Sequence, residues 1–165
     1  MNSNNSINKN IIGRAELINF PALGIANVPA KIDTGAYLSS VHASNIRLKN
    51  DGKTLVFTLF GAHPIVHDAA TQIETEKFRV VTVENSFGHQ EQRFEVELKV
   101  SMNGKLFTTP FTLANRGKKV FPVLVGRKLL NRRFVVDSSK ASVHRSDLKK
   151  RYNLEFDVDV ENDRV

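Results

Sequence analysis

The sequence predicts an all-β fold, and three patterns in it carry that prediction. Apolar and polar residues alternate from Phe94 to Met102, as they do in a strand with one buried face. Asn103-Gly104 follows, which is the preferred two-residue turn of a β-hairpin, and LFTTPFTL returns as the second strand. By contrast, only GRKLLNRR, which starts at Gly126, clearly has the pattern of a short helix.

Four further strands follow from the same signals. In residues 28–32 the apolar residues Val28, Ala30 and Ile32 occupy alternate positions, which predicts a strand that ends just before Asp33. Asn50-Asp51-Gly52 separates IRL from TLVFTLF and predicts a second hairpin. Residues 78–85 (FRVVTVEN) form another strand, which ends at the glycine-containing segment SFGHQ.

We expect one folded domain over residues 12–143, because 165 residues are too few for two full cores. The Asn- and Ser-rich residues 1–11 are expected to be a disordered tail. Residues 144–165 would form a C-terminal extension, with a second helix over 144–154 and an acidic tail at its end.

Composition limits the kind of protein. Cysteine is absent, which excludes disulfides and thiolate metal sites. No apolar run reaches the length of a membrane span, and the polar start MNSNNSINKN has no signal-peptide core. We therefore expect a cytoplasmic protein with no membrane partner.

The net charge is +7 and is unevenly distributed. The last eleven residues carry five acids and one arginine, so the rest of the chain carries a net +11. A surface of that kind attracts acidic polypeptides or nucleic acid, although excess lysine and arginine also serve solubility alone. No aromatic residues are interleaved with the basic ones in an RNA-binding pattern, so nucleic acid stays an open alternative.

The segment Asp33-Thr34-Gly35-Ala36 combines a carboxylate, a hydroxyl and a glycine at a strand end. Alone, this pattern is typical of an ordinary turn. A second element, PVLVGRKLL at residues 122–130, changes the interpretation, because apolar residues followed by Gly126 and a short helix accompany Asp-Thr-Gly in retroviral-type aspartic proteases.

The chain resembles one branch of those enzymes most closely. IDTGAxxSxxHA from Ile32, the stretch around Glu91 to Arg93, Asn115-Arg116 and LVGR look like the bacterial retropepsin-like, RimB-type endopeptidases, once labelled putative ATP-dependent zinc proteases. The resemblance implies a retropepsin-like acid-protease barrel with half of the active site in each chain. Such relatives are linked to trimming glutamate chains on a ribosomal protein, which suggests a peptide or protein substrate that is glutamate-rich or ribosome-associated.

An aspartic peptidase site needs two carboxyl groups close enough to share one proton. This sequence has one Asp-Thr-Gly only, since Asp137-Ser138-Ser139 lacks the glycine. The expected active species is therefore a homodimer in which Asp33 of each copy faces the other. Gly35 would allow close approach of the backbone, and Thr34, by resemblance, would bond to the opposite loop.

The resemblance also implies supporting and substrate-binding residues. Gly126 would pack behind the loop, and His42, at the position of the family's histidine, would be structural. Substrate contacts are expected from Ala36 and Tyr37, together with Arg127, which lacks the acidic partner that retroviral relatives place after the alanine.

Arg93 and Arg116 are candidates for binding substrate carboxylates, because a guanidinium suits that geometry. The alternative for each is an ordinary ion pair on the surface or at a strand edge.

A mobile hairpin is expected to cover such a site and exclude water. Strand order places it at residues 80–94 with its tip at 85–89, where Phe87 and Gly88 would contact substrate. The segment 61–71, which contains HPIVHD, is the alternative.

Other chemistries find less support. His63, His67 and Asp68 form no His-Glu-x-x-His motif, and Pro64 disfavours a helix there, so no metal is expected. Ser39, Ser40 and His42 are too close in sequence to form a triad along a strand. No phosphate-binding loop occurs, and we expect no cofactor. The rival from a different class is a non-catalytic dimeric clamp for an acidic polypeptide or ribosomal RNA.

Overall fold

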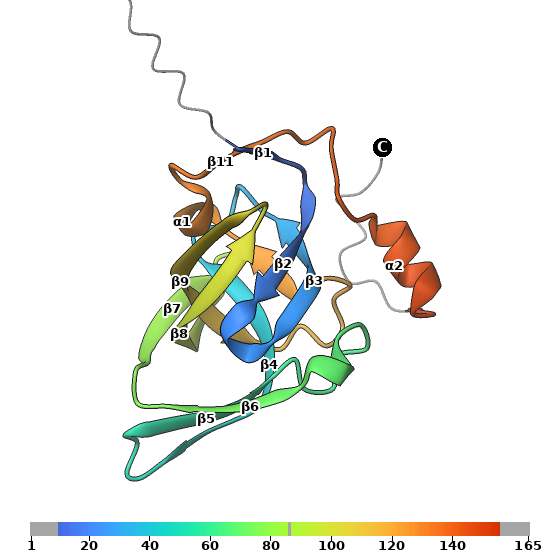
Figure 1. The fold of residues 1–165 in the computed structure, drawn as a ribbon. Coiled ribbons are helices and arrows are strands. Elements are labelled where there is room, and N and C mark those ends of the chain that lie inside the picture. Colours follow the sequence, from blue (N-terminus) through green and yellow to red (C-terminus); the bar gives the residue numbers. More distant parts are fainter. Residues whose placement is uncertain (1–9, 86, 156–165) are drawn as a thin grey trace, which may run out of the picture.

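The computed structural model describes residues 10–85 and 87–155 (Figure 1). The elements in chain order are β1 (Asn10–Ile12), β2 (Ala15–Phe20), the 3-10 helix η1 (Pro21–Leu23), β3 (Ile25–Ile32), β4 (Ser39–Lys49), β5 (Thr54–Leu59), the 3-10 helix η2 (His67–Ala69), β6 (Thr71–Thr75), β7 (Arg79–Glu84), β8 (Gln90–Met102), β9 (Lys105–Ala114), β10 (Val123–Val125), α1 (Arg127–Leu130), β11 (Phe134–Val136) and α2 (Arg145–Arg151).

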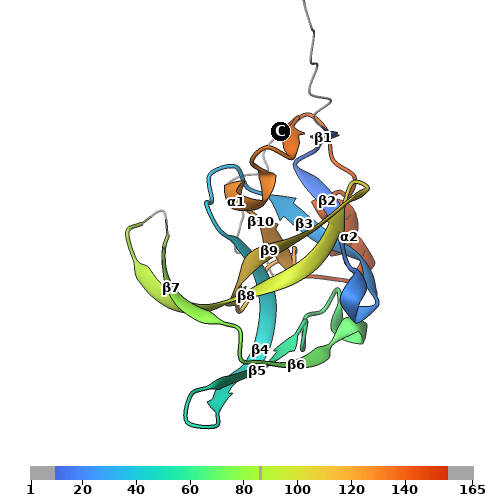
Figure 2. The ribbon, with the colours of Figure 1, turned by 60° about the vertical axis from the view of Figure 1, so that its left-hand side comes forward.

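Six strands close into a barrel. Neighbours follow the order β10–β3–β2–β8–β9–β4, and β10 also pairs with β4, which completes the ring. The short β10 runs parallel to β3 and antiparallel to β4. The other strands extend this barrel: β5 and β6 continue the sheet from β4, β7 pairs with β8, and β1 pairs with β11 at one end (Figures 1 and 2). The predicted all-β class and barrel are confirmed.

Both predicted hairpins are present. Asn103 and Gly104 have φ values of 48° and 75°, and Met102 lies opposite Lys105 across this two-residue turn. The turn between β4 and β5 likewise has positive φ at residues 50, 51 and 52. Asparagine, aspartate and glycine tolerate this left-handed conformation best, which explains their use at both turns.

The barrel interior is apolar. The even-numbered residues of β8 from Val96 to Met102 are buried in it, as their alternation predicts. Phe20, Phe57, Phe60 and Phe111 are fully buried and fill much of the volume. Glu95 breaks the pattern, because it lies on the polar side of β8 and is only 3% exposed.

Both ends of the chain contribute to the fold. Asn10 and Ile11 were placed in the expected tail, but they belong to β1, where they pair with Phe134 and Val135, so the expectation is wrong for these two residues. Residues 1–9 and the acidic residues 156–165 lie outside the described part of the chain. The expected second helix is α2, and Leu148 on it is buried in the core cluster. Over the described residues, neither helix has the length and apolar character that a bilayer crossing requires.

Candidate active site

Asp33 follows the last residue of β3 and begins the loop that leads to β4. Its Oδ1 accepts hydrogen bonds from the backbone N–H of Gly35 at 2.9 Å and of Ala36 at 3.1 Å, and its own N–H donates to Val125 O at 2.9 Å. Among the described residues no donor is bonded to Oδ2. The carboxyl group is therefore held in place through one oxygen. Asp33 is half-buried, and its other oxygen has no partner in the described part of the protein that would compete with a bound water molecule.

The start of α1 supports this loop from behind. The N–H of Arg127 donates to Ala36 O at 2.8 Å, and the N–H of Lys128 donates to Tyr37 O at 2.9 Å. A Cβ at Gly126 would lie 2.6 Å from Leu38 O, far inside contact distance. Only glycine allows the two segments to approach this closely.

Arg127 bonds to the same loop through its side chain. Nη1 donates to the carbonyl oxygens of Gly35 at 2.8 Å and Thr34 at 3.1 Å, and the guanidinium carbon lies 5.9 Å from the centroid of the Tyr37 ring. The partner that the sequence left open for Arg127 is thus the Asp-Thr-Gly loop of its own chain. The ring of Tyr37 takes the place beside the guanidinium.

Arg116 lies inside the protein, with only 9% of its surface exposed. Its Nε donates to Phe121 O at 2.9 Å, Nη1 to Ser40 Oγ at 3.4 Å, and its backbone N–H to His42 Nδ1 at 2.9 Å. The expectation that Arg116 binds a substrate carboxylate at the surface does not fit this position. Its guanidinium instead joins the loop before β10 to β4.

His42 and His63 form a buried pair, with ring centroids 5.1 Å apart. His42 Nδ1 accepts from Arg116, so its Nε2 carries the proton and donates to Gly61 O at 2.7 Å. Burial lowers the pKa of His42, and burial together with the neighbouring His42 lowers the pKa of His63 to about 4. Both rings are therefore neutral at pH 7.

The zinc alternative does not fit the positions of its candidate ligands. His63 uses Nε2 on Lys119 O at 3.1 Å, and its Nδ1 accepts from the N–H of Ile65 at 3.2 Å. His67 is instead exposed, next to Asp68. Within residues 10–85 and 87–155, no three His, Asp or Glu side chains are grouped to hold a metal ion.

Ser39 and Ser40 are buried and serve the loop rather than a nucleophilic site. Ser39 Oγ accepts from Gly126 N–H at 3.0 Å, and its carbonyl oxygen accepts from Thr112 Oγ1 at 3.2 Å. In the sequence, Ser39 was considered only as a nucleophile. Its role in bracing the loop has no local signal there, because its partner Gly126 lies 87 residues away.

The hairpin of β7 and β8 leaves the barrel and curves toward the end that carries α1 and the loop between β3 and β4 (Figure 2). Near its tip, Asn85 Oδ1 accepts from the N–H groups of Phe87 and His89, and Gly88 has φ of 80°. Phe87 is 85% exposed. Ser86, within the expected tip, lies outside the described residues.

The alternative flap at 61–71 is wrong. His63, Ile65 and Val66 in it are buried in the body of the protein, and η2 follows at once. Arg93 lies on β8 of the projecting hairpin, where Nε and Nη2 donate to Glu91 Oε2 at 3.0 and 2.8 Å. This is the strand ion pair that was the alternative to substrate binding.

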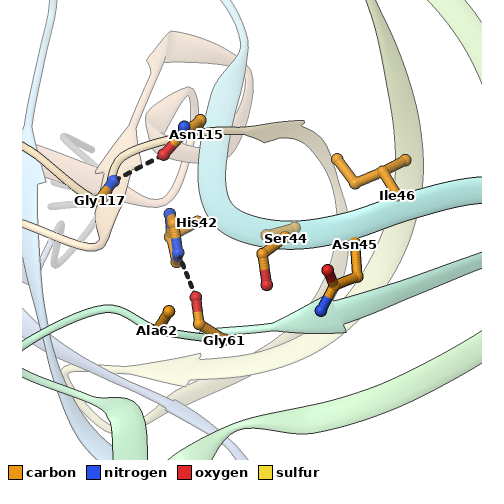
Figure 3. A pocket seen from close by; sticks show the side chains of 9 residues that line it. His42, Ser44, Asn45, Ile46, Gly61, Ala62, Asn115 and Gly117 are labelled. Carbon is orange, nitrogen blue, oxygen red and sulfur yellow. Dashed lines mark hydrogen bonds between the residues drawn. The ribbon is translucent and has the colours of Figure 1, made fainter.

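A pocket of about 390 Å³ lies farther along β4, beyond His42 (Figure 3). Ser44 and Asn45 line it on one side, and Gly61 and Ala62 on the other. Asp33 is not among its lining residues. The candidate catalytic residue Asp33 therefore lies outside this pocket.

A closed barrel, an Asp-Thr-Gly turn at a strand end and a glycine-led helix that braces the turn together define a retropepsin-like aspartic endopeptidase fold. The family model described as "Retropepsin-like aspartic endopeptidase RimB" matches residues 11–147. The chain belongs to this RimB-like family.

Curated relatives carry a different name. A protein of Desulfotalea psychrophila, named "Probable alpha-L-glutamate ligase", is 33% identical over 156 residues, which is 90% of this chain and 33% of the relative. One of Shewanella pealeana with the same name is 34% identical over 140 residues, 82% of this chain and 30% of the relative. The chain thus spans about a third of the length of these relatives.

Among solved structures, the crystal structure of Lpg0085 from Legionella pneumophila, a protein of unknown function, is similar to this chain with a TM-score of 0.61 and 26% identity. The match covers 80% of this chain and 95% of that one.

Proposed function

We propose that this protein is an aspartic peptidase that acts as a homodimer, with Asp33 of two copies as its catalytic pair. The observation that carries the proposal is the state of the Asp33 carboxyl group, which is anchored through Oδ1 and open at Oδ2. Thr34 and Gly35 beside it are exposed, as a loop that meets a second copy requires. The other candidate acid, Asp137, is bonded to Ser139 in a separate turn.

The chemistry follows from two carboxyl groups that hold one proton between them. The ionised Asp33 takes a proton from a water molecule, and the water oxygen forms a bond to the peptide carbonyl carbon. The protonated Asp33 of the other copy gives its proton to the carbonyl oxygen. The first Asp33 then gives the proton that it took from water to the amide nitrogen, and the C–N bond breaks. A hydroxyl proton of the tetrahedral species returns to the second Asp33, so the products are an amine and a carboxylic acid.

An acidic polypeptide is the proposed substrate. This chain matches about a third of the length of relatives that are named "Probable alpha-L-glutamate ligase". A peptidase that cleaves glutamate chains is the counterpart of a ligase that forms them. The net charge of +11 before the last eleven residues favours the same class of substrate. Arg127 adds a local reason, because among the described residues its Nε and Nη2 have no hydrogen-bond partner.

The proposed contact between copies lies at the end of the barrel that carries β1 and β11 (Figure 1). Ile11 and Val135 are paired across these strands and are 57% and 43% exposed. Two adjacent, exposed apolar side chains suit a surface that a second copy covers.

A non-catalytic clamp for an acidic polypeptide or RNA is the second candidate, and the uneven basic charge is what favours it. An enzyme loses cleavage when Asp33 is replaced by Asn but keeps its fold and its binding. A clamp is indifferent to that substitution. Binding of RNA that weakens steeply with rising salt supports the clamp.

The deciding experiment measures cleavage of oligoglutamate and of an unrelated peptide by the wild type and by Asp33→Asn, with and without a metal chelator. Activity that survives the chelator and disappears in the variant supports the proposal. Mixing the two proteins in equal amounts, with time for exchange, tests the paired site. Random pairing leaves about a quarter of the dimers with two Asp33 residues, whereas independent monomers would retain about half of the activity.

A further inference from the structure

A groove of about 760 Å³ lies on the flank of the barrel, at the base of the β7–β8 hairpin. Its floor is the polar face of β8 and part of β9, including Pro110, and β6 supplies Ile73 to one wall. Lys128, which directly follows Arg127, lines it as well. The groove is therefore next to the segment that supports the Asp-Thr-Gly loop, because the N–H of Lys128 bonds to Tyr37 O at 2.9 Å.

Glu95 is the unusual residue of this groove. It is 3% exposed, and Oε1 accepts from Arg79 Nε at 2.5 Å. Oε2 is buried without a hydrogen-bond donor among the described residues. A buried carboxylate oxygen without a donor is costly, because it has given up water and gained nothing in return.

The charges around Glu95 are mostly positive. Lys77, Lys99 and Lys128 line the groove, and none of them takes part in an ion pair within the part of the chain that the structure describes. Of the acids, Glu74 is paired with Lys49 at 2.5 Å. Glu97 is the remaining acid, so the three lysines outweigh it.

We propose that this groove is a second peptide-binding site, which holds a stretch of acidic substrate at a distance from the bond that is cut. The carboxylates of the bound chain face Lys77, Lys99 and Lys128. The Glu95 side chain turns as the chain binds, so that Oε2, buried in the free protein, accepts from one of the bound chain's N–H groups. Apolar walls such as Ile73 cover the backbone. The inference rests on the proposed function for its substrate class, but the binding it describes needs no cleavage.

Fluorescence anisotropy with labelled oligoglutamate chains of about three and ten residues tests the groove, since a second site raises the affinity of a chain that is long enough to occupy both sites at once. The protein is the full chain with Asp33→Asn, which does not cut the probe. Adding Lys77→Ala and Lys99→Ala together should weaken binding of the longer chain about tenfold, and that of the shorter chain less. The matched control is Lys53→Ala with Lys118→Ala, two exposed lysines outside the groove that remove the same charge.

Glu95→Gln tests the unpartnered Oε2 itself. If the glutamine oxygen keeps the bond to Arg79, the NH₂ group of the glutamine takes the place of Oε2. It then presents a donor where the N–H of the ligand needs an acceptor. We expect the longer chain to bind about tenfold more weakly, with an unchanged melting temperature showing that the fold persists.

Three outcomes overturn the inference: equal losses for both chain lengths, an effect of the control pair as large as that of the groove pair, or no binding of the longer chain before the groove is altered. If wild type fails to cut oligoglutamate while the groove effects are present, the proposed function is wrong and the binding site stands.

Discussion

Arg127 and Gly35 are joined by a hydrogen bond of 2.8 Å from Nη1 to the carbonyl oxygen, across 92 positions of the chain. The same nitrogen also bonds to Thr34 O, and the guanidinium lies over Tyr37. Arg127 thus fixes the peptide groups that follow Asp33, and those groups in turn hold the carboxyl orientation. We regard it as a positioning residue for the proposed reaction.

Arg127→Lys should lower kcat/KM for the cleaved peptide about tenfold to a hundredfold, because an ammonium group cannot reproduce the planar contact with the carbonyl oxygens and Tyr37. Arg132→Lys is the matched control, since Arg132 is exposed and follows α1 without a side-chain hydrogen bond in the described structure. A merely structural Arg127 would show its loss in the melting temperature and leave kcat unchanged.

Gly126→Ala should destabilise the fold by about 2 kcal/mol, because the new Cβ would lie 2.6 Å from Leu38 O and 2.9 Å from Tyr37 O. Both obstacles are backbone atoms, so the loop or α1 must shift. Urea unfolding measures the change. In Gly117→Ala the nearest atom is a side-chain oxygen of Asn115 at 3.2 Å, which can move, so this control should cost clearly less.

His63 should make the protein less stable in acid. Its pKa is about 4 in the folded protein and near 6.5 in the unfolded chain, so the unfolded chain binds the proton first as the pH falls. The free energy that the neutral, buried His63 ring contributes to folding is fully present above pH 6.5, and it is lost as the pH falls toward 4. The loss over this window is about 3 kcal/mol, and protonation of buried His42, whose pKa is also lowered, adds to it.

The measurement is the free energy of unfolding in urea between pH 4 and pH 7. His63→Gln should flatten the dependence on pH relative to the wild type. Equal slopes for wild type and His63→Gln would contradict the prediction.

Phe87 near the hairpin tip is 85% exposed, so its ring contributes little to the stability of a single chain. If the hairpin closes over substrate, Phe87→Ser should raise KM about tenfold with no change in melting temperature. Phe94, half-buried against Phe78 at a centroid distance of 5.7 Å, gives the contrast, since Phe94→Ser should lower stability. An unchanged KM for Phe87→Ser would remove the hairpin tip from the substrate site.

Local patterns were enough to predict the hairpins. Asn103-Gly104 and the alternation before it specify a turn and a buried face within a few residues, and the structure has both. Gly126 was identified through the resemblance to the glycine motif of aspartic proteases, and the structure supplies the physical reason, because a Cβ there would lie 2.6 Å from Leu38 O.

Long-range burial was not predictable in the same way. Arg116 looked like a surface cation, but its partners Phe121 O, Ser40 and His42 come from two segments, and together they satisfy the buried guanidinium. Glu95 has the alternating position of a solvent-facing residue, and only the packing around the groove buries it. Charged residues such as these are exposed on average, so a sequence pattern gives the wrong answer when a partner is distant.

The contact between copies gives the last prediction. Ile11→Lys and Val135→Lys introduce charge at two apolar positions that lie opposite each other in β1 and β11. If a second copy covers these side chains, the dimer dissociation constant should rise at least about tenfold, and specific activity should fall as the enzyme is diluted. Sedimentation velocity measures the first effect and a dilution series the second. Leu48→Lys, at a 46% exposed position on the β4–β5 extension, is the matched control and should alter neither.

Because Asp33 occurs in the only Asp-Thr-Gly of the sequence, the paired site predicts that dissociation and loss of cleavage occur at the same protein concentration. Full activity in a variant that sediments as a monomer would contradict the paired site itself.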